Sequence, residues 1–417
     1  MLYAYGPGPS TGGAPTIRRG SRIVDDSCDI AIIGGGGMGC SAAYFLQRMG
    51  ARAQGIVVIE PDPTYGRSST ALAAGGIRQQ FSTPENILMS QFGFGFLQSL
   101  GDILAVEGER PDAGLTPTPY LRLGGPEALL RMAAEHRLQR SFGAQTRWLE
   151  PDELARRFPW MRTDGVACAV LGGPREGLFD PYSMLQAFRR KAQAAGVRFV
   201  KARAVGIDVG RSRRAVSAVR LDDARSIACG ALVNAAGPRA AQVAAMAEVR
   251  LPVEALKAHS FAFRAEALSP ACPVLLDHAG GVQLKPEGQL FVCAAPSAER
   301  AEPAAEHDFD PDPRLFEDKV WPRLAARVPR FEELKLERAW VGHIERCTLD
   351  GNPIIGAHPQ IRNLYFLNGF SGHGVQHAPA AGRALAELIV HGAFRSIDLS
   401  RFGFERILDG GRVVEAV

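Results

Sequence analysis

The chain has 417 residues, of which 46% are hydrophobic and 22% are charged, and its formal net charge is only +4. A chain of this length exceeds the size at which a single hydrophobic core stops growing, so two domains are expected. The basic residues are scattered apart from short clusters such as residues 211–214, which are more simply solvated turns than a nucleic-acid surface, so no nucleic-acid partner is expected.

The seven cysteines are far apart in the sequence and form no Cys-x-x-Cys pair. This pattern favours a reducing compartment and argues against a disulfide framework, an iron–sulfur cluster or a structural zinc site, so we expect no metal. No apolar run reaches the ~20 residues that a membrane-spanning helix needs. Residues 1–26 are rich in Gly and Pro and lack an apolar signal core, which predicts a flexible extension of a cytoplasmic protein. The arginines of this extension keep an organelle matrix open as the alternative location.

The first predicted element is a strand–turn–helix unit that opens at residues 30–33 with a short apolar strand. The strand leads into Gly34-x-Gly36-x-x-Gly39 and then into a helical pattern. Gly34 allows a tight turn, Gly36 lets the backbone approach a pyrophosphate, and Gly39 lets the helix pack closely on the strand. The unpaired amides at the helix N-terminus then face the phosphates.

A second apolar strand at residues 56–59 ends on an acid, Glu60. A carboxylate at this place can accept hydrogen bonds from an adenosine ribose. A lone glycine motif is weak, because glycine-rich turns are common. Strand, glycines, helix, strand and terminal acid together predict that the chain binds a dinucleotide.

Residues 67–81 consist mainly of small residues between Arg67 at their start and a second arginine, Arg78, near their end. Backbone of this kind can lie flat against a ring system or a pyrophosphate, although a plain loop would look the same. Helical apolar spacing follows at residues 84–110, with shorter helical patterns at residues 126–140 and 151–158. Because this region lacks the alternation of strands and helices, it indicates the first part of a second domain.

The nucleotide-binding pattern resumes near residue 180 with a helix and four strands, and residues 252–296 then alternate as in an antiparallel sheet. The four strands are predicted at residues 197–200, 204–209, 215–221 and 231–237. Residues 298–312 predict a loop, and a helix at residues 313–327 completes the second domain. The last part of the chain contains a strand at residues 364–367 and a glycine-rich segment, residues 369–382, before an amphipathic helix. A glycine-rich turn at a helix start suits the flavin edge that gains negative charge on reduction.

Five segments carry a family resemblance: IIGGGGMG, VVIE, SSTALAAGGIRQQF, LVNAAG and GFSGHGVQHAPAAGR. In this order they resemble the D-amino-acid-oxidase, glycine-oxidase and sarcosine-oxidase superfamily of FAD enzymes, over about residues 28–400. Within it the chain is most similar to the sarcosine and dimethylglycine dehydrogenase-like branch. The resemblance implies a fold of the α/β and α+β class, with a Rossmann-type FAD-binding domain and a second, mostly antiparallel-sheet substrate domain.

The resemblance also implies a discontinuous domain division. The FAD-binding domain is expected to comprise residues 27–84, 171–250 and 335–400, and the substrate domain residues 85–170 and 251–334. By resemblance, the residues that contact FAD are Gly34, Gly36, Gly37, Met38, Gly39, Glu60, Ser68, Ser69, Thr70, Ala74, Gly75, Gly76, Val205, Ala236, Gly237, Gly372, His373, Gly374, Val375 and Gln376.

Three departures from the family pattern concern the flavin linkage and the reaction with oxygen. Leu72 stands where dimethylglycine-type dehydrogenases carry a flavin-linked histidine, and the flavin-linking cysteine of monomeric sarcosine oxidases falls at His343, four residues before Cys347. We therefore expect non-covalent FAD. The lysine that activates oxygen in those oxidases aligns with Phe291 in this chain, and the nearby Lys285 stands at a different strand position. A missing lysine at this place puts the reaction with oxygen in doubt and favours a dehydrogenase. The electron acceptor stays open between an electron-transfer flavoprotein, a quinone and oxygen.

The family chemistry is hydride transfer from the carbon that bears the substrate amine to flavin N5, followed by hydrolysis of the imine. Arg78 is the candidate for binding the α-carboxylate of an amino acid or a sarcosine-like secondary amine, and a salt bridge at the domain boundary is the alternative role. Gln376 replaces the partner lysine of the sarcosine oxidases, and since a neutral amide holds a carboxylate less strongly, this suggests a substrate that is larger than sarcosine or differently charged.

Two further side chains, His343 and Glu345, stand where the family places residues that face the substrate. Glu345 could bind a second, cationic amine or tune the pKa of the bound amine. For His343 a packed, hydrogen-bonded histidine near the flavin is the equally good alternative. His278, His259 and His377 are assigned structural roles, and Arg239, where the family has tryptophan, has no interpretation.

Two alternatives to an amine-oxidising enzyme remain at this point. A pyridine-nucleotide-dependent flavin reductase is disfavoured, because the sequence has no second Gly-x-Gly-x-x-Gly unit and no paired redox cysteines. The second alternative is a protein that binds flavin but serves in assembly or as a scaffold, with secondary or no catalysis.

Overall fold

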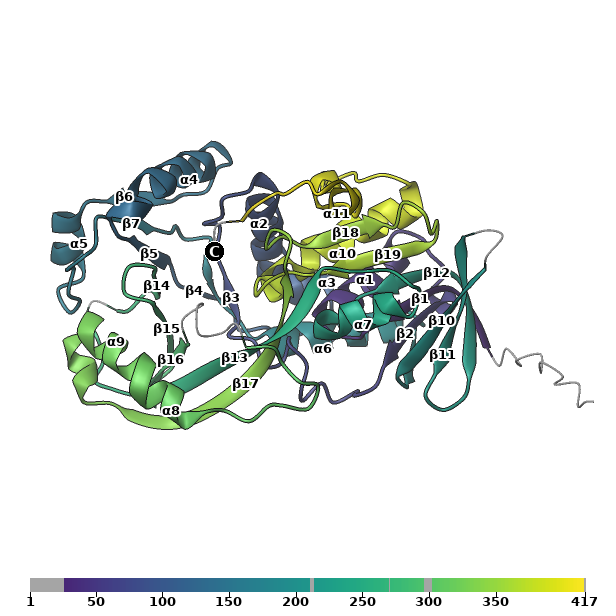
Figure 1. Cartoon of the computed structure of the whole chain (residues 1–417), viewed down its shortest axis with the longest axis horizontal. Coiled ribbons are helices and arrows are strands. Elements are labelled where there is room, and N and C mark those ends of the chain that lie inside the picture. Colours follow the sequence, from purple (N-terminus) through teal and green to yellow (C-terminus); the bar gives the residue numbers. More distant parts are fainter. Residues whose placement is uncertain (1–25, 211–213, 270, 296–301, 416–417) are drawn as a thin grey trace, which may run out of the picture.

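A computed structural model describes residues 26–210, 214–269, 271–295 and 302–415 of the chain. The expected extension, residues 1–26, lies outside these ranges except for its last residue. The described chain forms two lobes, each built around one eight-stranded sheet (Figure 1). A small three-stranded sheet of β3 (Gly76–Ile77), β8 (Gly177–Leu178) and β4 (Thr116–Pro117) lies in addition to these two. Within the described ranges, no helix is both long and apolar enough to cross a bilayer.

The first sheet has the strand order β10-β11-β12-β1-β2-β9, with β19 paired to β12 and β18 paired to β19. Its parallel strands are β1 (Asp26–Ile33), β2 (Ile56–Glu60), β9 (Arg198–Lys201), β12 (Ser226–Asn234) and β19 (Leu364–Asn368). Its antiparallel strands are β10 (Ala204–Gly210), β11 (Ala215–Leu221) and β18 (Ile354–Ala357).

Alternate side chains of the central strands enter two different cores. Ile30 and Ile32 of β1 pack into one core together with the helices α1 (Gly37–Arg48), α6 (Pro181–Ala194) and α10 (Gly374–His391). Ala31 and Ile33 pack into the core on the other face, which includes α7 (Ala240–Ala245). A strand that is buried on both faces must be apolar throughout, which explains the uninterrupted apolar runs of β1 and β2.

The second sheet has the order β17-β13-β16-β15-β14-β5-β7-β6 and is antiparallel except between β14 and β5. The strands are β17 (Lys335–Cys347), β13 (Val253–Arg264), β16 (Leu290–Ala294), β15 (Val282–Glu287), β14 (Val274–Asp277), β5 (Tyr120–Gly124), β7 (Cys168–Leu171) and β6 (Arg147–Leu149). One face packs in a third core with α5 (Pro151–Arg157), α8 (Pro313–Leu315) and α9 (Trp321–Arg327). The predicted fold class, a Rossmann-type domain with a second, mostly antiparallel sheet, is confirmed.

The structure differs from the expected domain division at two places. The helices α2 (Pro84–Gln98) and α3 (Leu100–Ile103), expected in the substrate domain, pack into the core of the first sheet through Phe94, Phe96 and Leu100. Apolar residues surround α2 instead of forming one stripe, which is typical of a helix buried between other elements. β17, expected in the FAD-binding domain, pairs with β13 along its length and belongs to the second sheet.

The C-terminal helices bring distant segments together. α10 begins at Gly374, earlier than the predicted amphipathic helix, and crosses α1 closely because Gly382 lies against Ser41. The remaining helices are α4 (Leu129–Ser141), which packs on β7, and α11 (Glu405–Asp409).

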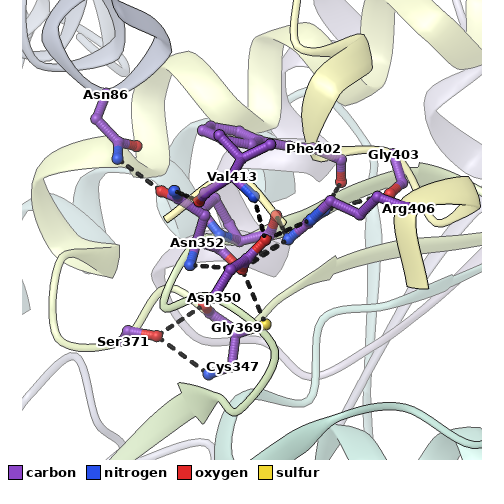
Figure 2. A network of polar contacts seen from close by, with 11 residues as sticks. Asn86, Cys347, Asp350, Asn352, Gly369, Ser371, Phe402, Gly403, Arg406 and Val413 are labelled. Carbon is purple, nitrogen blue, oxygen red and sulfur yellow. Dashed lines mark hydrogen bonds and ion pairs between the residues drawn. The ribbon is translucent and has the colours of Figure 1, made fainter. Parts of the chain in front are cut away.

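A buried ion pair anchors α11 to the loop between β17 and β18. Figure 2 shows Arg406 directed at the Asp350 carboxylate, with Nε to Oδ2 at 3.0 Å. The side chains of Asp350 and Arg406 are 0% and 7% exposed. Arg406 also donates to the carbonyls of Phe402, Gly403 and Asn352, so its guanidinium is well satisfied.

Substitution of Arg406 by alanine is expected to lower the stability of the protein by roughly 3–5 kcal/mol, because it leaves the Asp350 carboxylate buried without a cation. Differential scanning calorimetry would show this as a fall of several degrees in Tm. Arg412→Ala is the control, because Arg412 is exposed on the same segment. Equal Tm values for the two variants would contradict the prediction.

Candidate functional site

A cavity of about 1350 Å³ lies between the two large sheets. One wall is formed by the carboxyl ends of parallel strands, including Ile33 of β1 and Ile59 of β2. The opposite wall is one face of the second sheet, including Ser260 of β13 and Gln283 of β15. In open α/β sheets the carboxyl ends of the strands are the usual place for a ligand.

The residues expected to contact FAD gather around this cavity. All of them line it except Gly39, and these are Gly34, Gly36, Gly37, Met38, Glu60, Ser68, Ser69, Thr70, Ala74, Gly75, Gly76, Val205, Ala236, Gly237, Gly372, His373, Gly374, Val375 and Gln376. They come from at least six separate stretches of the chain, so the fold brings together what the sequence spreads out.

The three motif glycines have distinct steric surroundings. Gly34 has a φ of +101°, and an added Cβ would lie 2.3 Å from the Ala235 carbonyl oxygen. At Gly39 an added Cβ would lie 1.8 Å from the Gly34 carbonyl oxygen, so any side chain would force the helix away from the turn. At Gly36 the nearest atom is Thr70 Oγ1 at 3.6 Å, so this position is open and lines the cavity. An open backbone position of this kind fits the close approach of a pyrophosphate.

Glu60 connects the end of β2 to the glycine turn. Its Oε2 accepts a hydrogen bond from the Gly35 amide at 2.8 Å, and its Oε1 accepts one from the Asp62 amide at 2.9 Å. Burial raises the pKa of Glu60, while these two amides oppose the shift by stabilising the carboxylate. The acid at the strand end therefore orders the turn and lines the cavity as well.

Arg78 is a buried cation in the wall of the cavity. It is 7% exposed, and its guanidinium lies over the Phe81 ring at 4.2 Å. Nη1 donates to the Gln80 carbonyl and Nη2 lies 3.0 Å from His373 Nε2. In the described part of the chain, the guanidinium forms no ion pair with a carboxylate. Burial lowers the pKa of Arg78 to about 10, with a further contribution from Arg122.

His373 and Gln376 hold Arg78 in place from the start of α10. Since arginine only donates, His373 must accept at Nε2 and is therefore neutral. Burial holds the pKa of His373 well below its usual range, with Arg78 as the second cause. Gln376 Oε1 accepts a hydrogen bond from the Arg78 amide at 2.8 Å. The structure thus places Gln376 as a support of Arg78.

Glu345 and His343 line the cavity from β17, but both already have partners. Glu345 Oε2 accepts from the Gly369 amide at 3.0 Å, and burial raises the pKa of Glu345 to about 7 against this hydrogen bond. His343 stacks on Phe309 at 4.1 Å, and its Nε2 lies 2.7 Å from the Asp308 carbonyl. The bonding of Glu345 to the turn disfavours its expected role in binding a second amine, and His343 matches the alternative of a packed histidine.

The wall formed by the second sheet contains residues that the sequence analysis did not select. Strand register places the side chains of Arg122, Leu276, Gln283, Ala294 and Ser260 in one row across five strands. All except Arg122 line the cavity. Directly opposed residues of neighbouring strands share a face, so this row is the surface that faces a ligand. The alternation of Val282 and Leu284 with polar neighbours was the sequence pattern that could have identified it.

His278 is exposed and lines the same wall, whereas the sequence analysis gave it a structural role. It follows directly on β14, and its amide donates to the Leu123 carbonyl at 3.1 Å. Desolvation by the surrounding protein lowers the pKa of His278 to about 3, and the charges of Arg122, Arg78 and Arg131 add to the shift. The imidazole is therefore neutral and lies in a positive field.

Phe291 and Lys285, the two residues considered for the position of the oxygen-activating lysine, lie on different faces of the second sheet. Phe291 points into the third core, where its ring lies 5.0 Å from that of Phe331, away from the cavity. Lys285 lies on the cavity face of its sheet, two residues after Gln283, and its ammonium donates to the carbonyl of the lining residue Ala74 and to Glu287. No lysine lines the cavity as far as the structure describes the chain. Cys347 is also absent from the lining, whereas Leu72 contributes to it.

Behind Arg78, a buried acid fixes the neighbouring backbone. Glu176 accepts hydrogen bonds from the amides of Gln79 at 3.0 Å and Tyr120 at 2.9 Å, and from Gln80 Nε2 at 3.3 Å. Burial raises the pKa of Glu176 to about 7 in spite of these hydrogen bonds and of Arg78.

Glu176→Gln is expected to change how stability depends on pH. Since the folded-state pKa lies above the ordinary 4.5, the proton of Glu176 stabilises the folded protein at low pH, and this contribution is lost as the pH rises toward 7. The wild type should therefore lose stability relative to the glutamine variant between about pH 5 and pH 8, by up to about 3 kcal/mol. Calorimetric Tm values of both proteins across this range test this, and a constant difference would contradict it.

Comparison with known proteins places the chain in a family. Residues 29–388 match the family model described as FAD-dependent oxidoreductase (DAO). The chain is 40% identical to FAD-dependent oxidoreductase domain-containing protein 1 of Xenopus laevis, over 95% of this chain and 86% of that protein. It is 27% identical to the mitochondrial sarcosine dehydrogenase of Mus musculus, over 94% of this chain and 43% of that protein.

The fold has solved counterparts. The crystal structure of L-proline dehydrogenase from P. horikoshii superposes with a TM-score of 0.80 at 23% identity and covers 93% of this chain and 100% of that chain. Glycine oxidase from Bacillus cereus has a TM-score of 0.71 at 19% identity, over 92% and 98% of the two chains. These likenesses concern the fold, while the family match concerns the sequence. The chain therefore belongs to the DAO family of FAD-dependent oxidoreductases, as its glycine motifs and their order predicted.

Proposed function

We propose that this flavoprotein oxidises the C–N bond of an amino acid or of an N-methylated, sarcosine-like amine. The observation that carries the proposal is Arg78, a buried guanidinium without a carboxylate partner among the described residues, in the wall of the cavity that the dinucleotide motif also lines. A buried cation needs a counter-charge, and a substrate carboxylate would supply it.

FAD fits the residues present. The open position at Gly36 and the acid Glu60 suit the ADP part, and the amides before α10 suit the flavin edge that becomes negative on reduction. The binding would be non-covalent, because Leu72 and His343 replace the residues that link the flavin in related enzymes, and Cys347 does not line the cavity. When bound, FAD would supply the acceptor for a hydride, that is two electrons and one proton, from the carbon next to the substrate nitrogen.

The protein would hold the substrate through its carboxylate. Arg78 offers donors in a planar fork. His373 contacts this fork, and Gln376 fixes the backbone that carries it. Held in this way, the substrate would present the same carbon at each turnover, which lowers the entropic part of the barrier.

The amine must be neutral when it is oxidised. Desolvation, and after it the charges of Arg122 and Arg78, lowers the pKa of His278, and the same surroundings would lower the pKa of a substrate amine beside it. The neutral imidazole of His278, exposed at the cavity, could accept a hydrogen bond from this amine. The positive field of Arg122 and Arg78 would disfavour a second cation, and Glu345 is bonded to the turn at Gly369. Substrates with neutral or acidic substituents are therefore expected to react faster than those with basic ones.

The absence of a lysine from the described cavity lining supports a dehydrogenase over an oxidase. Electrons would then pass to an electron-transfer flavoprotein or a quinone, with oxygen as the alternative acceptor. The compartment would be the cytoplasm or an organelle matrix.

An anaerobic titration tests the proposal. The visible absorption band of the purified flavoprotein would be followed while sarcosine, proline, N-methylglutamate and N-methyl-lysine are added in turn. Bleaching by at least one of them, fastest for those without a second cation, is the expected result, and admission of air would then distinguish an oxidase from a dehydrogenase. A band that only dithionite bleaches would contradict the proposal and favour a flavin-bearing scaffold protein.

A further inference from the structure

The segment that carries Arg78 is a short strap between β3 and α2, residues 78–83. Side chains from other parts of the chain hydrogen-bond to it at several places along its length, and one of them is Gln139, whose Nε2 donates to the Phe81 carbonyl at 3.2 Å. Gln376 accepts from the Arg78 amide at the start of the strap, and Glu176 accepts from Gln79 and Gln80 in its middle. Phe81 lies beneath the guanidinium and contacts the rings of His373 at 5.0 Å and His377 at 5.2 Å.

A further set of hydrogen bonds to the strap comes from Glu415, near the C-terminal end of the described residues. Glu415 is 5% exposed, and its Oε1 accepts from the Ser82 amide at 2.7 Å. Its Oε2 accepts from Thr83 Oγ1 at 2.7 Å and from Asn86 Nδ2 at 2.9 Å. Both carboxylate oxygens are therefore used at the junction of the strap and α2. The negative charge of Glu415 also raises the pKa of Arg78, which opposes the lowering of this pKa by burial.

The segment around Glu415 is held firmly enough to act as a support. The Val413 amide donates to Asp350 Oδ2 at 3.1 Å, and Asn352 donates to the Val413 carbonyl (Figure 2). The Asn86 side chain bonds to Asn352 Oδ1 at 2.7 Å as well as to Glu415. Asp350 in turn is the partner of Arg406 in the buried ion pair.

We propose that Glu415 is a positioning residue of the substrate site, which fixes the strap of residues 78–83 and thereby the guanidinium of Arg78. The proposal rests on the proposed function, in which Arg78 binds a substrate carboxylate. Without Glu415, the Ser82 amide and the Thr83 hydroxyl lose a buried acceptor. The adjacent Phe81, on whose ring the guanidinium lies, then keeps the hydrogen bond from Gln139 to its carbonyl but loses the anchor at Ser82.

A simpler role is that Glu415 only stabilises α2, since a carboxylate at a helix N-terminus is favourable. The two roles differ in what they predict for ligand binding. A helix stabiliser lowers Tm when it is removed but leaves the folded site unchanged. A positioning residue changes the affinity for a carboxylate and leaves the affinity for an uncharged analogue unchanged.

The experiment uses the FAD-loaded full chain and two probes, acetate and acetamide, whose binding is followed by the change in the visible flavin spectrum. Glu415→Ala is expected to raise the Kd for acetate on the order of tenfold, with unchanged flavin content and an unchanged response to acetamide. Glu415→Gln keeps one good acceptor and should fall between the wild type and the alanine variant. Arg412→Ala, an exposed change on the same segment, should behave as the wild type.

The outcomes separate the two proposals. If Arg78→Gln weakens acetate binding while Glu415→Ala matches Arg412→Ala, the positioning role is overturned and the carboxylate site stands. If acetate binds equally well to the wild type and to Arg78→Gln, the proposed function fails and the positioning role fails with it.

Discussion

Replacement of Arg78 by glutamine is expected to weaken binding of carboxylate-bearing substrates by roughly two orders of magnitude while the flavin stays bound. Charge-assisted hydrogen bonds to a buried carboxylate contribute several kcal/mol, and a neutral amide cannot replace them. The guanidinium is also costly in the ligand-free protein, since it is 7% exposed and bonds only to a carbonyl and an imidazole among the described groups. Tm of the variant should therefore not fall by more than a few degrees.

The measurement is the rate of anaerobic flavin reduction as a function of substrate concentration, with an amine that bleaches the wild type. The loss should be in the apparent affinity more than in the limiting rate. Arg78→Lys keeps the charge but loses the fork, so its loss should be intermediate. Arg314→Gln is the control, because its side chain is 83% exposed. Full activity of Arg78→Gln would show that the substrate carboxylate binds elsewhere, or that the substrate has none.

Gly39→Ala is expected to abolish both flavin binding and normal stability, because its Cβ would lie 1.8 Å from the Gly34 carbonyl oxygen. The contact is with backbone, so α1 would have to move away from the turn, at a cost of several kcal/mol. Gly36→Ala should behave differently. Its Cβ meets nothing closer than Thr70 Oγ1 at 3.6 Å, so the protein should fold normally but bind FAD at least roughly tenfold more weakly.

Flavin content after purification, the Kd for FAD from fluorescence quenching and the Tm of the flavin-free protein separate these two effects. Gly95→Ala is the matched control, since Gly95 lies within α2 and an added Cβ there meets nothing within 4 Å. If Gly36→Ala bound FAD as tightly as the wild type, the pyrophosphate would have to approach another part of the turn.

The sequence predicted best those features that depend on neighbouring residues. The unit from β1 to Glu60 was identified because strand period, glycine spacing and terminal acid lie within one short stretch. The small residues of 67–81 and the glycine-rich turn before α10 were selected for the same reason. The packing of α2 against the first sheet was not predicted, because a helix that is apolar all round shows no face from which its partner can be inferred.

The sequence by itself thus determined the fold class, the family and most of the residues on the dinucleotide-motif side of the cavity, since each rests on local patterns. Only the tertiary structure decided what the charged residues contact. In the tertiary structure, the Arg78 guanidinium has no carboxylate partner among the described residues. Glu345 is bonded to the Gly369 amide, and Glu415 is bonded to Thr83, 332 positions away in the sequence. The tertiary structure also places Gln283 and His278 in the wall of the cavity. The physical reason is that strand register and chain crossing set which distant groups meet, and a buried charge takes its pKa and its role from those groups.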